Sequence, residues 1–355
     1  MRVVVVGASG NVGTSLLSSL GEERQVKSIV GIARRRPTID FAKTVWVQAD
    51  IERDELEPHL AGADAVVHLA CKIQPSRDLD ALRGTNVLGS GRVFEAVAKA
   101  GVRNLVYASS VGVYSPGPKN RFVDESWPRD GIPTSFYSRH KAEVERILDR
   151  FEQEAPAVRV VRLRPGLIFK RDAGEGIRRL FFGPFLPSAL VRPRLLPLVP
   201  DLPRLRFQAV DSFDVANAYR LALLSDVRGA FNLAADPVLD GPKLARLLDA
   251  RRVRMSARLL RGVVGLSWRL RLQPTPAGWI DLALGVPLLD VTRARTELRW
   301  TPTRTAADAF LQLVQGIRER RGIATPPLSR KSSGQARTGE FATGVGQHEP
   351  PDGSS

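Results

Sequence analysis

The stretch Arg2-Val-Val-Val-Val-Gly7-Ala-Ser-Gly10-Asn-Val-Gly13 decides the fold of this chain. Four consecutive valines predict a buried strand, and the glycines after them predict a tight turn into a helix. In such a turn the glycines let main-chain N–H groups approach a pyrophosphate, and the helix N-terminus favours the anion. We therefore expect a dinucleotide to bind at Gly7, Ser9, Gly10, Asn11, Val12 and Gly13.

Apolar runs alternate with helical patterns through the first half of the chain. Strands are predicted at 3–6, 28–33, 44–48, 65–69, 105–108 and 158–163, and helices around 12–20, 55–60, 85–100 and 137–152. Strands that are apolar on both faces are typical of a parallel sheet covered by helices. The pattern predicts an α/β fold with a Rossmann-type doubly wound parallel sheet, whose ligands lie at the carboxyl ends of the strands.

The character of the sequence changes after Pro165. Residues 1–165 are expected to form the nucleotide-binding domain, and residues 207–234 are expected to return to it. The smaller substrate-binding part then comprises residues 166–206 and 235–323. Helical patterns cover 207–225, 241–272 and 304–321, and 231–234 predicts a strand. Residues 324–355 are rich in Pro, Ser, Gly and Thr, which predicts a disordered tail.

The net charge of +16 comes from 53 basic and 37 acidic residues and lies mostly in the second half. Residues 166–323 hold 26 basic and 14 acidic residues, a net of +12, whereas residues 1–165 hold 24 and 20, a net of +4. Such a basic half favours an anionic small-molecule substrate. No nucleic-acid-binding module is recognisable, so no nucleic-acid partner is expected.

Cysteine and histidine are scarce in the chain. Cys71 is the single cysteine, and the four histidines show no spacing typical of metal ligands, so neither a disulfide nor a metal site is predicted. No apolar run approaches the roughly 20 residues of a membrane span, and the start of the chain does not resemble a signal peptide. The cytoplasm is the expected compartment.

The stretch 251–272 is both basic and apolar. On a helical wheel one side carries Leu259, Val263, Leu266 and Leu270, and another carries Arg258, Arg261 and Arg269. A helix of this kind can lie on an anionic membrane surface. Packing against the core is the more usual cause of an apolar stripe, and we favour that interpretation.

A candidate proton-transfer site follows the fifth predicted strand. Ser109 and Ser110 end that strand, and Tyr137-Ser-Arg-His-Lys141 lies on a predicted helix, where the spacing puts Tyr137 and Lys141 on one face. A free tyrosine has a pKa near 10, which is too high for a base at neutral pH. A neighbouring ammonium group stabilises the phenolate and lowers that pKa.

Together these segments resemble an extended short-chain dehydrogenase/reductase of the NAD-dependent epimerase/dehydratase group, similar to UDP-glucose 4-epimerase. Further matching segments are 107–114, Glu125, Arg164-Pro165-Gly166, 214–216, 231–233 and 292–302. The resemblance implies that Ser110, Tyr137 and Lys141 are catalytic, with Ser110 selected over Ser109. It also implies a homodimer. The further cofactor contacts that it implies are Asp50, Ile51, Leu69, Ala70, Tyr137, Lys141, Pro165 and Gly166.

The end of the second predicted strand bears on the choice of cofactor. A carboxylate at Ala33 would bind the ribose 2′-hydroxyl of NAD, but alanine offers none. Arg34 and Arg35 follow directly and suit a 2′-phosphate. The cofactor is therefore expected to be NAD(P), with NADP favoured over NAD.

Residues that depart from the family pattern reduce the number of reactions that the chain is expected to catalyse. Val111-Gly112 stand where family dehydratases carry an acidic pair, which argues against elimination and decarboxylation. Leu167 replaces an asparagine that binds the substrate diphosphate in family epimerases, and Lys170 replaces a glycine. The basic residues that remain available for a diphosphate are Arg192, Arg194 and Arg206.

Three functions remain open. The first is an epimerase-like enzyme acting on a nucleotide sugar. The second is an NADP(H)-dependent reductase or dehydrogenase of a less polar substrate, for which Phe181 and Phe182 offer apolar lining. The third, of another class, is a cofactor-sensing binding protein with weak catalysis.

Overall fold

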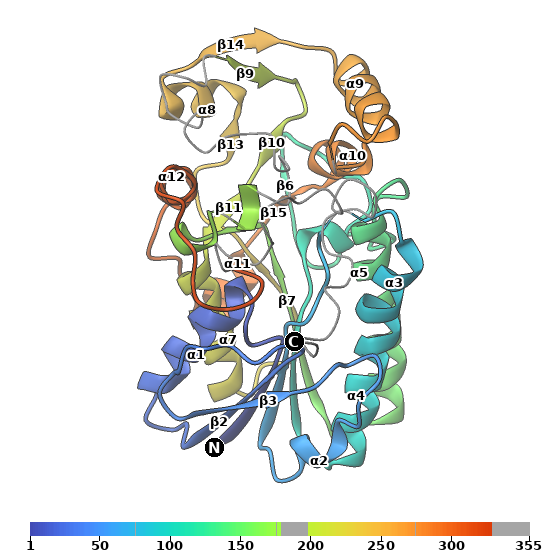
Figure 1. The fold of residues 1–355 in the computed structure, drawn as a ribbon, viewed down its shortest axis with the longest axis vertical. Coiled ribbons are helices and arrows are strands. Elements are labelled where there is room, and N and C mark those ends of the chain that lie inside the picture. The colour runs from blue at the N-terminus through green and yellow to red at the C-terminus, as the bar shows by residue number, and fades with distance from the viewer. Residues whose placement is uncertain (75, 175, 179–197, 274, 329–355) are drawn as a thin grey trace, which may run out of the picture.

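A seven-stranded parallel sheet forms the centre of the computed structural model, which describes residues 1–74, 76–174, 176–178, 198–273 and 275–328 (Figure 1). The sheet order is β12-β7-β5-β4-β1-β2-β3. These strands are β1 (Arg2–Val6), β2 (Ser28–Ala33), β3 (Thr44–Gln48), β4 (Ala65–His68), β5 (Asn104–Ala108), β7 (Arg159–Pro165) and β12 (Gly229–Leu233). The order runs outward in both directions from β1 and β4, so the predicted doubly wound α/β fold is confirmed.

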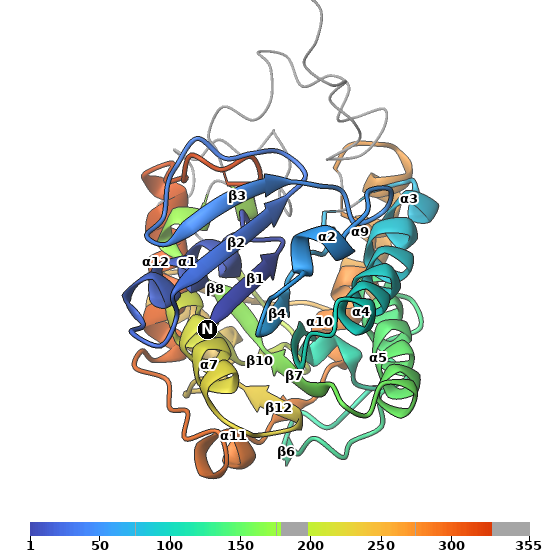
Figure 2. The same cartoon turned by 90° about the horizontal axis from the view of Figure 1, so that it is seen from below.

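Helices cover both faces of the sheet (Figures 1 and 2). On one face lie α1 (Asn11–Glu22) and α7 (Ser212–Leu224), which share a core cluster with Val3 and Val5. On the other lie α4 (Ser90–Lys99) and α5 (Phe136–Glu154), which share a cluster with Val4 and Val6. Successive side chains of a strand point to opposite faces, so the run of four valines supplies both cores.

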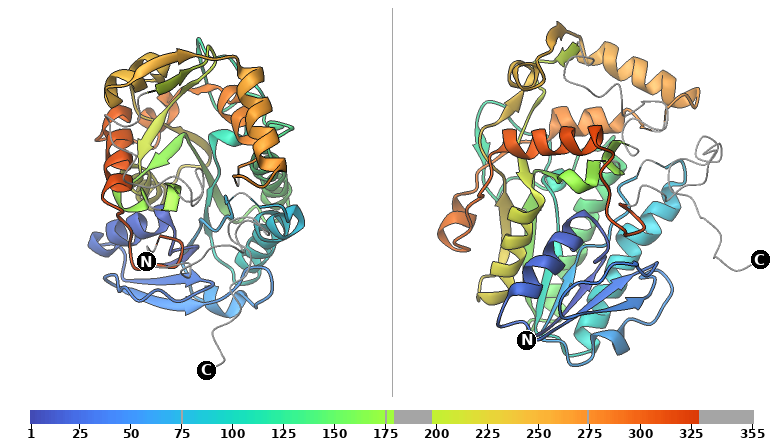
Figure 3. Two further views of the ribbon diagram at one scale, coloured as in Figure 1. Left: turned by 45° about the horizontal axis from the view of Figure 1, so that its top comes forward. Right: turned by 60° about the vertical axis from the view of Figure 1, so that its left-hand side comes forward.

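Shorter elements lie beyond the carboxyl ends of the sheet strands (Figures 1 and 3). Within the described residues, small two-stranded sheets pair β6 (Phe122–Val123) with β15 (Leu288–Leu289), β8 (Leu167–Phe169) with β11 (Ala209–Asp211), β9 (Leu198–Asp201) with β14 (Arg251–Arg254), and β10 (Arg206–Phe207) with β13 (Leu239–Asp240). The helices there are α8 (Gly241–Leu248), α9 (Ala257–Arg269), α10 (Gly278–Gly285) and α12 (Ala306–Arg318), whereas α11 (Thr292–Thr296) packs beside β12, and its Ala294 belongs to the same core cluster as residues of α1 and α7. Two short helices, α2 (Glu57–Leu60) and α3 (Leu79–Arg83), flank the sheet itself.

Two of the predicted helices are wrong in their extent. The helix expected over 207–225 begins only at Ser212, because 209–211 pair with β8 and the Asp211 side chain caps α7 by accepting from the Phe213 N–H. The helix expected over 241–272 is divided into α8 and α9. Asp249 ends α8 in the left-handed conformation, with φ of 50°, and β14 follows as a strand paired with β9.

The apolar side of α9 faces outward. Leu259, Val263, Leu266 and Leu270 are each 57–61% exposed, and α9 contains no buried residue. The favoured interpretation, that this stripe packs against the core, is therefore wrong.

The predicted tail begins later than the sequence suggests. Thr325 and Leu328 are buried, and the Thr38 hydroxyl donates to the carbonyl of Ala324 at 3.4 Å, so residues 324–328 belong to the folded part. The remainder of the predicted tail, 329–355, lies outside the described residues. Every helix in the described ranges is too short or too polar to cross a membrane.

Candidate active site

The carboxyl ends of the sheet strands bring the predicted site segments to one edge. Because all pairs in this sheet are parallel, the turns after the strands meet there. Gly7 follows β1, Arg34 follows β2, Asp50 lies beyond β3, Leu69 follows β4 and Ser109 follows β5.

The glycine turn is shaped by two close main-chain approaches. Gly7 has a φ of 84°, and a Cβ atom there would lie 2.5 Å from the Ala70 nitrogen. A Cβ at Gly13 would lie 2.4 Å from the Ala8 carbonyl oxygen, so helix α1 packs directly on the turn. No side chain larger than hydrogen fits either position. Both glycines are therefore required by the packing of the turn itself.

The start of α1 suits the phosphates and hydroxyls of a dinucleotide. Gly10 is the N-cap, no side chain caps the helix, and its first turn carries no acidic residue. In the described part of the chain the buried Oδ1 atom of Asn11 has no hydrogen-bond partner. Uncapped amides attract an anion, and a buried lone acceptor calls for a donor. The residues present therefore fit the expected cofactor.

Lys170 reaches the same helix turn from the other half of the chain. Its buried ammonium group donates to the Thr14 hydroxyl at 3.0 Å and lies 5.0 Å from the Phe213 ring centre. Burial lowers the pKa of Lys170 to about 8, against the opposing effect of two carboxylates. The departure from glycine noted in the sequence thus adds a cation beside the glycine turn.

Arg34 and Arg35 are exposed just beyond β2. Nearby, the Asp50 carboxylate accepts from the Glu52 N–H at 3.0 Å, and Ile51 is buried. Burial raises the pKa of Glu52, but hydrogen bonds from Thr85 and Lys72, with the positive charges of Lys72 and Arg34, outweigh it and keep that pKa below its usual value. Arg34 thus lies near one ionised carboxylate, that of Glu52.

Asn86 fixes the segment that follows β4, a role that the sequence analysis missed. Its Oδ1 accepts from the Lys72 N–H at 2.7 Å, and its Nδ2 donates to the Lys72 carbonyl at 2.9 Å. Asn86 lies in a π-helical turn, Gly84–Gly89, between α3 and α4. Such turns occur often at functional sites, and this one holds the main chain just past Leu69 and Ala70.

The two serines after β5 point to different neighbours. The Ser109 hydroxyl donates to the Glu145 carboxylate at 2.5 Å, inside the protein. Ser110 accepts from the Gly112 N–H at 3.0 Å. A Cβ atom at Gly112 would lie 3.4 Å from the Ser110 Oγ and 3.0 Å from Cε1 of Tyr137. Ser110, and not Ser109, is thus the serine beside the tyrosine.

Tyr137 and Lys141 lie one turn apart on α5. The Lys141 ammonium donates to the Ala108 carbonyl at 2.6 Å and to the Tyr107 hydroxyl at 3.3 Å, and it lies 6.0 Å from the centre of the Tyr137 ring. Burial raises the pKa of Tyr137, whereas the Lys141 charge and the Ser110 hydrogen bond lower it. The structure therefore brings Ser110, Tyr137 and Lys141 together.

Gly112 and Trp279 enclose the tyrosine ring. A Cβ at Gly112 would lie 3.0 Å from Cε1 of Tyr137, so the position that is acidic in dehydratases has no room here without movement. Trp279 of α10 stacks on Tyr137 with ring centroids 5.5 Å apart and an interplanar angle of 23°. No sequence signal linked Trp279 to this site, because it is far from Tyr137 along the chain.

In the segment Arg164-Pro165-Gly166, which matches the family pattern, the arginine side chain stabilises the fold. Buried Arg164 donates to both Glu145 oxygens, at 2.9 and 2.6 Å, and to the Tyr114 hydroxyl at 3.0 Å. Arg162 joins this network through Asp149 at 2.7 Å. The contacts join β7 to α5, the helix that carries Tyr137.

Pro165 is buried at the end of β7, and Gly166 donates to the Leu233 carbonyl at 2.9 Å.

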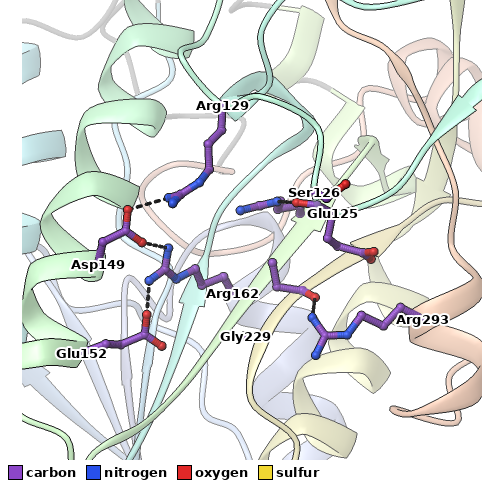
Figure 4. Close-up of a pocket in the computed structure, with 10 residues that line it drawn as sticks. Glu125, Ser126, Arg129, Asp149, Glu152, Arg162, Gly229 and Arg293 are labelled. Atoms are coloured by element: carbon purple, nitrogen blue, oxygen red, sulfur yellow. Dashed lines mark hydrogen bonds and ion pairs between the residues drawn. The ribbon is translucent and has the colours of Figure 1, made fainter.

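An open pocket of about 380 Å³ lies against this network rather than at the glycine turn (Figure 4). Its charged lining residues are paired with one another or with main chain, as in Arg129 with Asp149 at 2.8 Å and Arg293 with the Ala230 carbonyl at 2.7 Å. None of the predicted site residues lines it. We therefore infer that the residues lining this pocket stabilise the fold, and that the pocket is not part of the candidate site.

A cluster of three cations lies at β10 and α10. Buried Lys119 donates to the carbonyls of Arg206 and Ala283, at 2.8 and 2.9 Å. Arg204 donates to the carbonyls of Leu284 and Gly117, and Arg206 donates to that of Lys119. Within the described ranges the buried Arg206 Nε has no hydrogen-bond partner. Burial first, and then the two arginines, lowers the pKa of Lys119 to about 7.

Other expected lining residues cannot be placed. Phe181, Phe182, Arg192 and Arg194 lie outside the described residues. His, Cys, Asp and Glu side chains form no group of three that suits a metal ion anywhere in the described ranges.

Two proteins of known sequence are similar to this chain. An uncharacterised protein of Mycobacterium tuberculosis is 28% identical over 332 residues, which cover 93% of this chain but 31% of the relative, so this chain spans about a third of that protein's length. N-acetyl-alpha-D-glucosaminyl-diphospho-ditrans,octacis-undecaprenol 4-epimerase of Escherichia coli O157:H7 is 32% identical over 178 residues, or 49% of this chain and 51% of the relative.

Solved structures show the same fold. UDP-glucose 4-epimerase of Thermus thermophilus, solved with NAD, superposes with a TM-score of 0.67 at 21% identity and covers 90% of this chain and 99% of that one. UDP-glucuronic acid 4-epimerase of Bacillus cereus, solved with UDP-glucuronic acid and NAD, gives 0.67 at 17% identity, with 90% and 100% covered. The family model described as the NAD dependent epimerase/dehydratase family matches residues 3–234. The chain therefore belongs to this family of extended short-chain dehydrogenases/reductases.

Proposed function

We propose that this enzyme acts, as an epimerase-like oxidoreductase, on a sugar carried by a diphosphate, with Ser110, Tyr137 and Lys141 as its catalytic residues. The observation that carries the proposal is the assembly of these three side chains at the sheet edge, beside a glycine turn that fits a dinucleotide. When bound, the nicotinamide supplies reversible hydride transfer. The protein must then supply proton transfer and the orientation of the substrate.

Each catalytic side chain has a distinct task in this proposal. The Tyr137 oxygen accepts the proton of the substrate hydroxyl and later returns it. Ser110, which lies beside Tyr137 at Gly112, holds the substrate oxygen in place. The Lys141 charge favours the phenolate form of Tyr137. One such set can oxidise a carbon and reduce it again, as epimerisation requires, and no additional acid is needed.

The cation cluster supports an anionic substrate. The hydrogen bonds of Lys119, Arg204 and Arg206 that involve described residues run to carbonyl groups, which do not neutralise their charge. A diphosphate would provide that neutralisation and would occupy the lone Arg206 Nε donor. The E. coli relative is named for a sugar on a polyprenol diphosphate, and the solved neighbours for UDP-sugars, so the diphosphate is common to both.

The substrate class is tested by measuring binding and turnover with two groups of compounds. We expect UDP-sugars or a polyprenyl-diphosphate sugar to raise the melting temperature in the presence of cofactor and to be epimerised. Arg206→Met should weaken their binding about tenfold or more, since hydrogen bonds between charged groups are strong. Arg103→Met, at an exposed arginine outside the cluster, is the matched control and should bind normally. Equal binding by both variants would remove the diphosphate from the proposal.

Two observations favour a second candidate, the reductase of a less polar substrate. Trp279 forms an apolar wall on Tyr137, and Leu167 replaces the family's diphosphate-binding asparagine. The same assay distinguishes the two. Net oxidation of NAD(P)H by hydrophobic carbonyls, with no epimerisation of any sugar, would favour the reductase. Nothing in the structure favours the cofactor-sensing binding protein.

We also infer that NADP(H) binds more tightly than NAD(H), because Arg34 and Arg35 follow β2 where a carboxylate would otherwise select NAD. Calorimetry should show the preference, and Arg34→Ala with Arg35→Ala should weaken NADPH binding while leaving NADH binding nearly unchanged. The expected loss is about tenfold. A wild type with equal affinities, or with tighter binding of NADH, would refute this role for the arginines.

A further inference from the structure

The outward side of α9 is an unusual surface for a protein in water. Leu259, Val263, Leu266 and Leu270 follow one another at intervals of four, three and four residues, so they form one continuous stripe along the helix. Their side chains are 57–61% exposed, and Leu272, just past the helix, is 60% exposed. Scattered exposed leucines are normal, but a contiguous apolar stripe marks an interaction site.

The stretch of chain that carries the stripe is basic, although two of its arginines pair with carboxylates of other segments, Arg252 with Asp201 and Arg261 with Asp281. Residues 251–280 contain seven arginines and no acidic residue. Arg258 and Arg269 flank the same edge of the stripe and are exposed, and Arg271 lies just beyond it. Strand β14, which precedes α9, contributes three of the seven. An apolar stripe framed by arginine carries both components of an interfacial helix.

The opposite side of α9 is already attached to the protein. The Arg77 guanidinium lies 4.4 Å from the Trp268 ring centre and donates to the Trp268 carbonyl. Arg261 pairs with Asp281 of α10 at 2.9 Å. Gln273 donates to the Val264 carbonyl at 3.0 Å. The helix is thus held by one side, and the exposed stripe lies on the other. Figure 3 shows α9, in orange, at an outer edge of the molecule.

We propose that α9 docks in the surface of an anionic lipid bilayer, with its leucine and valine stripe among the acyl chains and its arginines at the headgroups. The charge complementarity is specific to this choice: arginine attracts anionic headgroups, and hydrocarbon accepts the apolar stripe. Nucleic acid would satisfy the arginines but not the leucines. A second copy of this chain would satisfy the leucines but would bring like charges together.

Docking of α9 on a bilayer would affect the candidate site, because α9 is connected to α10, which packs against that site. Only a short segment, 270–277, separates the two helices, and Trp279 of α10 stacks on Tyr137. The α9 contact with Arg77 joins it to the segment that follows β4. With a bilayer on the stripe, α9 would therefore lie between the lipid and α10, whose Trp279 stacks on the tyrosine. The surface itself stands on exposure and charge and does not depend on the substrate proposed above.

The test is cosedimentation of the full chain with vesicles. Phosphatidylcholine vesicles that contain phosphatidylglycerol should bind the wild type, and phosphatidylcholine alone should bind it much more weakly. Val263→Asp with Leu266→Asp should reduce binding to the anionic vesicles by roughly tenfold or more. Val45→Asp is the matched control: Val45 is 67% exposed on β3, at the other end of the molecule, and binding should stay at the wild-type level.

A second variant separates charge from apolar contact. Arg258→Gln with Arg269→Gln keeps the stripe and should lower the preference for anionic over neutral vesicles, and added salt should do the same to the wild type. Melting temperatures near the wild-type value establish that the variants fold. The proposal is overturned by absence of vesicle binding, or by equal binding of wild type and the aspartate variant. It is also overturned if the aspartate variant instead converts a dimer to a monomer.

Discussion

Replacing Tyr137 with phenylalanine is expected to lower turnover by about a thousandfold or more while leaving cofactor affinity within a factor of about two. The substitution removes only the phenolic oxygen, to which we assign the proton transfer, and it keeps the ring that stacks on Trp279. The measurement is kcat on any substrate that the wild type accepts, together with calorimetric titration of the cofactor. Undiminished turnover by Tyr137→Phe would end the proposed mechanism.

A control and a second variant sharpen this test. Tyr219→Phe removes the hydroxyl of another buried tyrosine, on α7, and should keep its activity. Lys141→Met removes the charge that lowers the pKa of Tyr137, so that pKa should rise further above its ordinary value. The activity that depends on the phenolate should then appear only at higher pH. If Lys141→Met left the pH profile of kcat/KM unchanged, Lys141 would not control the pKa of Tyr137.

Replacing Glu145 with glutamine should cost about 3–5 kcal/mol of unfolding free energy. The Glu145 carboxylate is fully buried and accepts hydrogen bonds from the Ser109 hydroxyl and from the Nε and Nη2 atoms of Arg164. The amide leaves the Arg164 charge without its counter-ion inside the protein. Urea or thermal denaturation measures the loss. Glu152→Gln, at a partly exposed partner of Arg162, is the control and should cost less than about 1 kcal/mol.

The contribution of the Glu145 carboxylate to the free energy of unfolding depends on pH. Burial raises the pKa of Glu145, but the hydrogen bond and charge of Arg164, followed by Ser109 and Arg162, outweigh it and hold that pKa below its ordinary value. A depressed pKa means that the stabilisation is full above the unfolded pKa of about 4.3 and is lost as pH falls through the folded value. The difference between wild type and Glu145→Gln should therefore shrink in acid. A constant difference from neutral pH into acid would contradict this account.

The sheet strands were predictable because their signal is local. Each is a short apolar run between turn residues, and β2 and β3 have the predicted bounds. Elements of the second half were less predictable, since the short strands there are recognised by pairing rather than by composition. Strand β14 reads as part of a basic helix until its pairing with β9 is known.

The neighbours of the candidate site were only partly predictable. The tyrosine and lysine lie one helical turn apart, so their shared face follows from the sequence alone. The neighbour of each serine does not, because Ser109 and Ser110 are adjacent in the chain and only packing places one against Glu145 and the other beside Tyr137. The Lys119, Arg204 and Arg206 cluster was likewise hidden, since it joins two segments far apart along the chain.

The sequence by itself determined the parallel sheet, the glycine turn and the pairing of Tyr137 with Lys141, because hydrophobic period and residue spacing are properties of a local stretch. Tertiary structure alone decided which surfaces meet. It placed Trp279 on Tyr137, and it left the stripe of α9 facing outward although the pattern equally suits a core helix. The physical reason is that periodicity states which side of a helix is apolar, whereas only the packing of distant segments decides what covers that side.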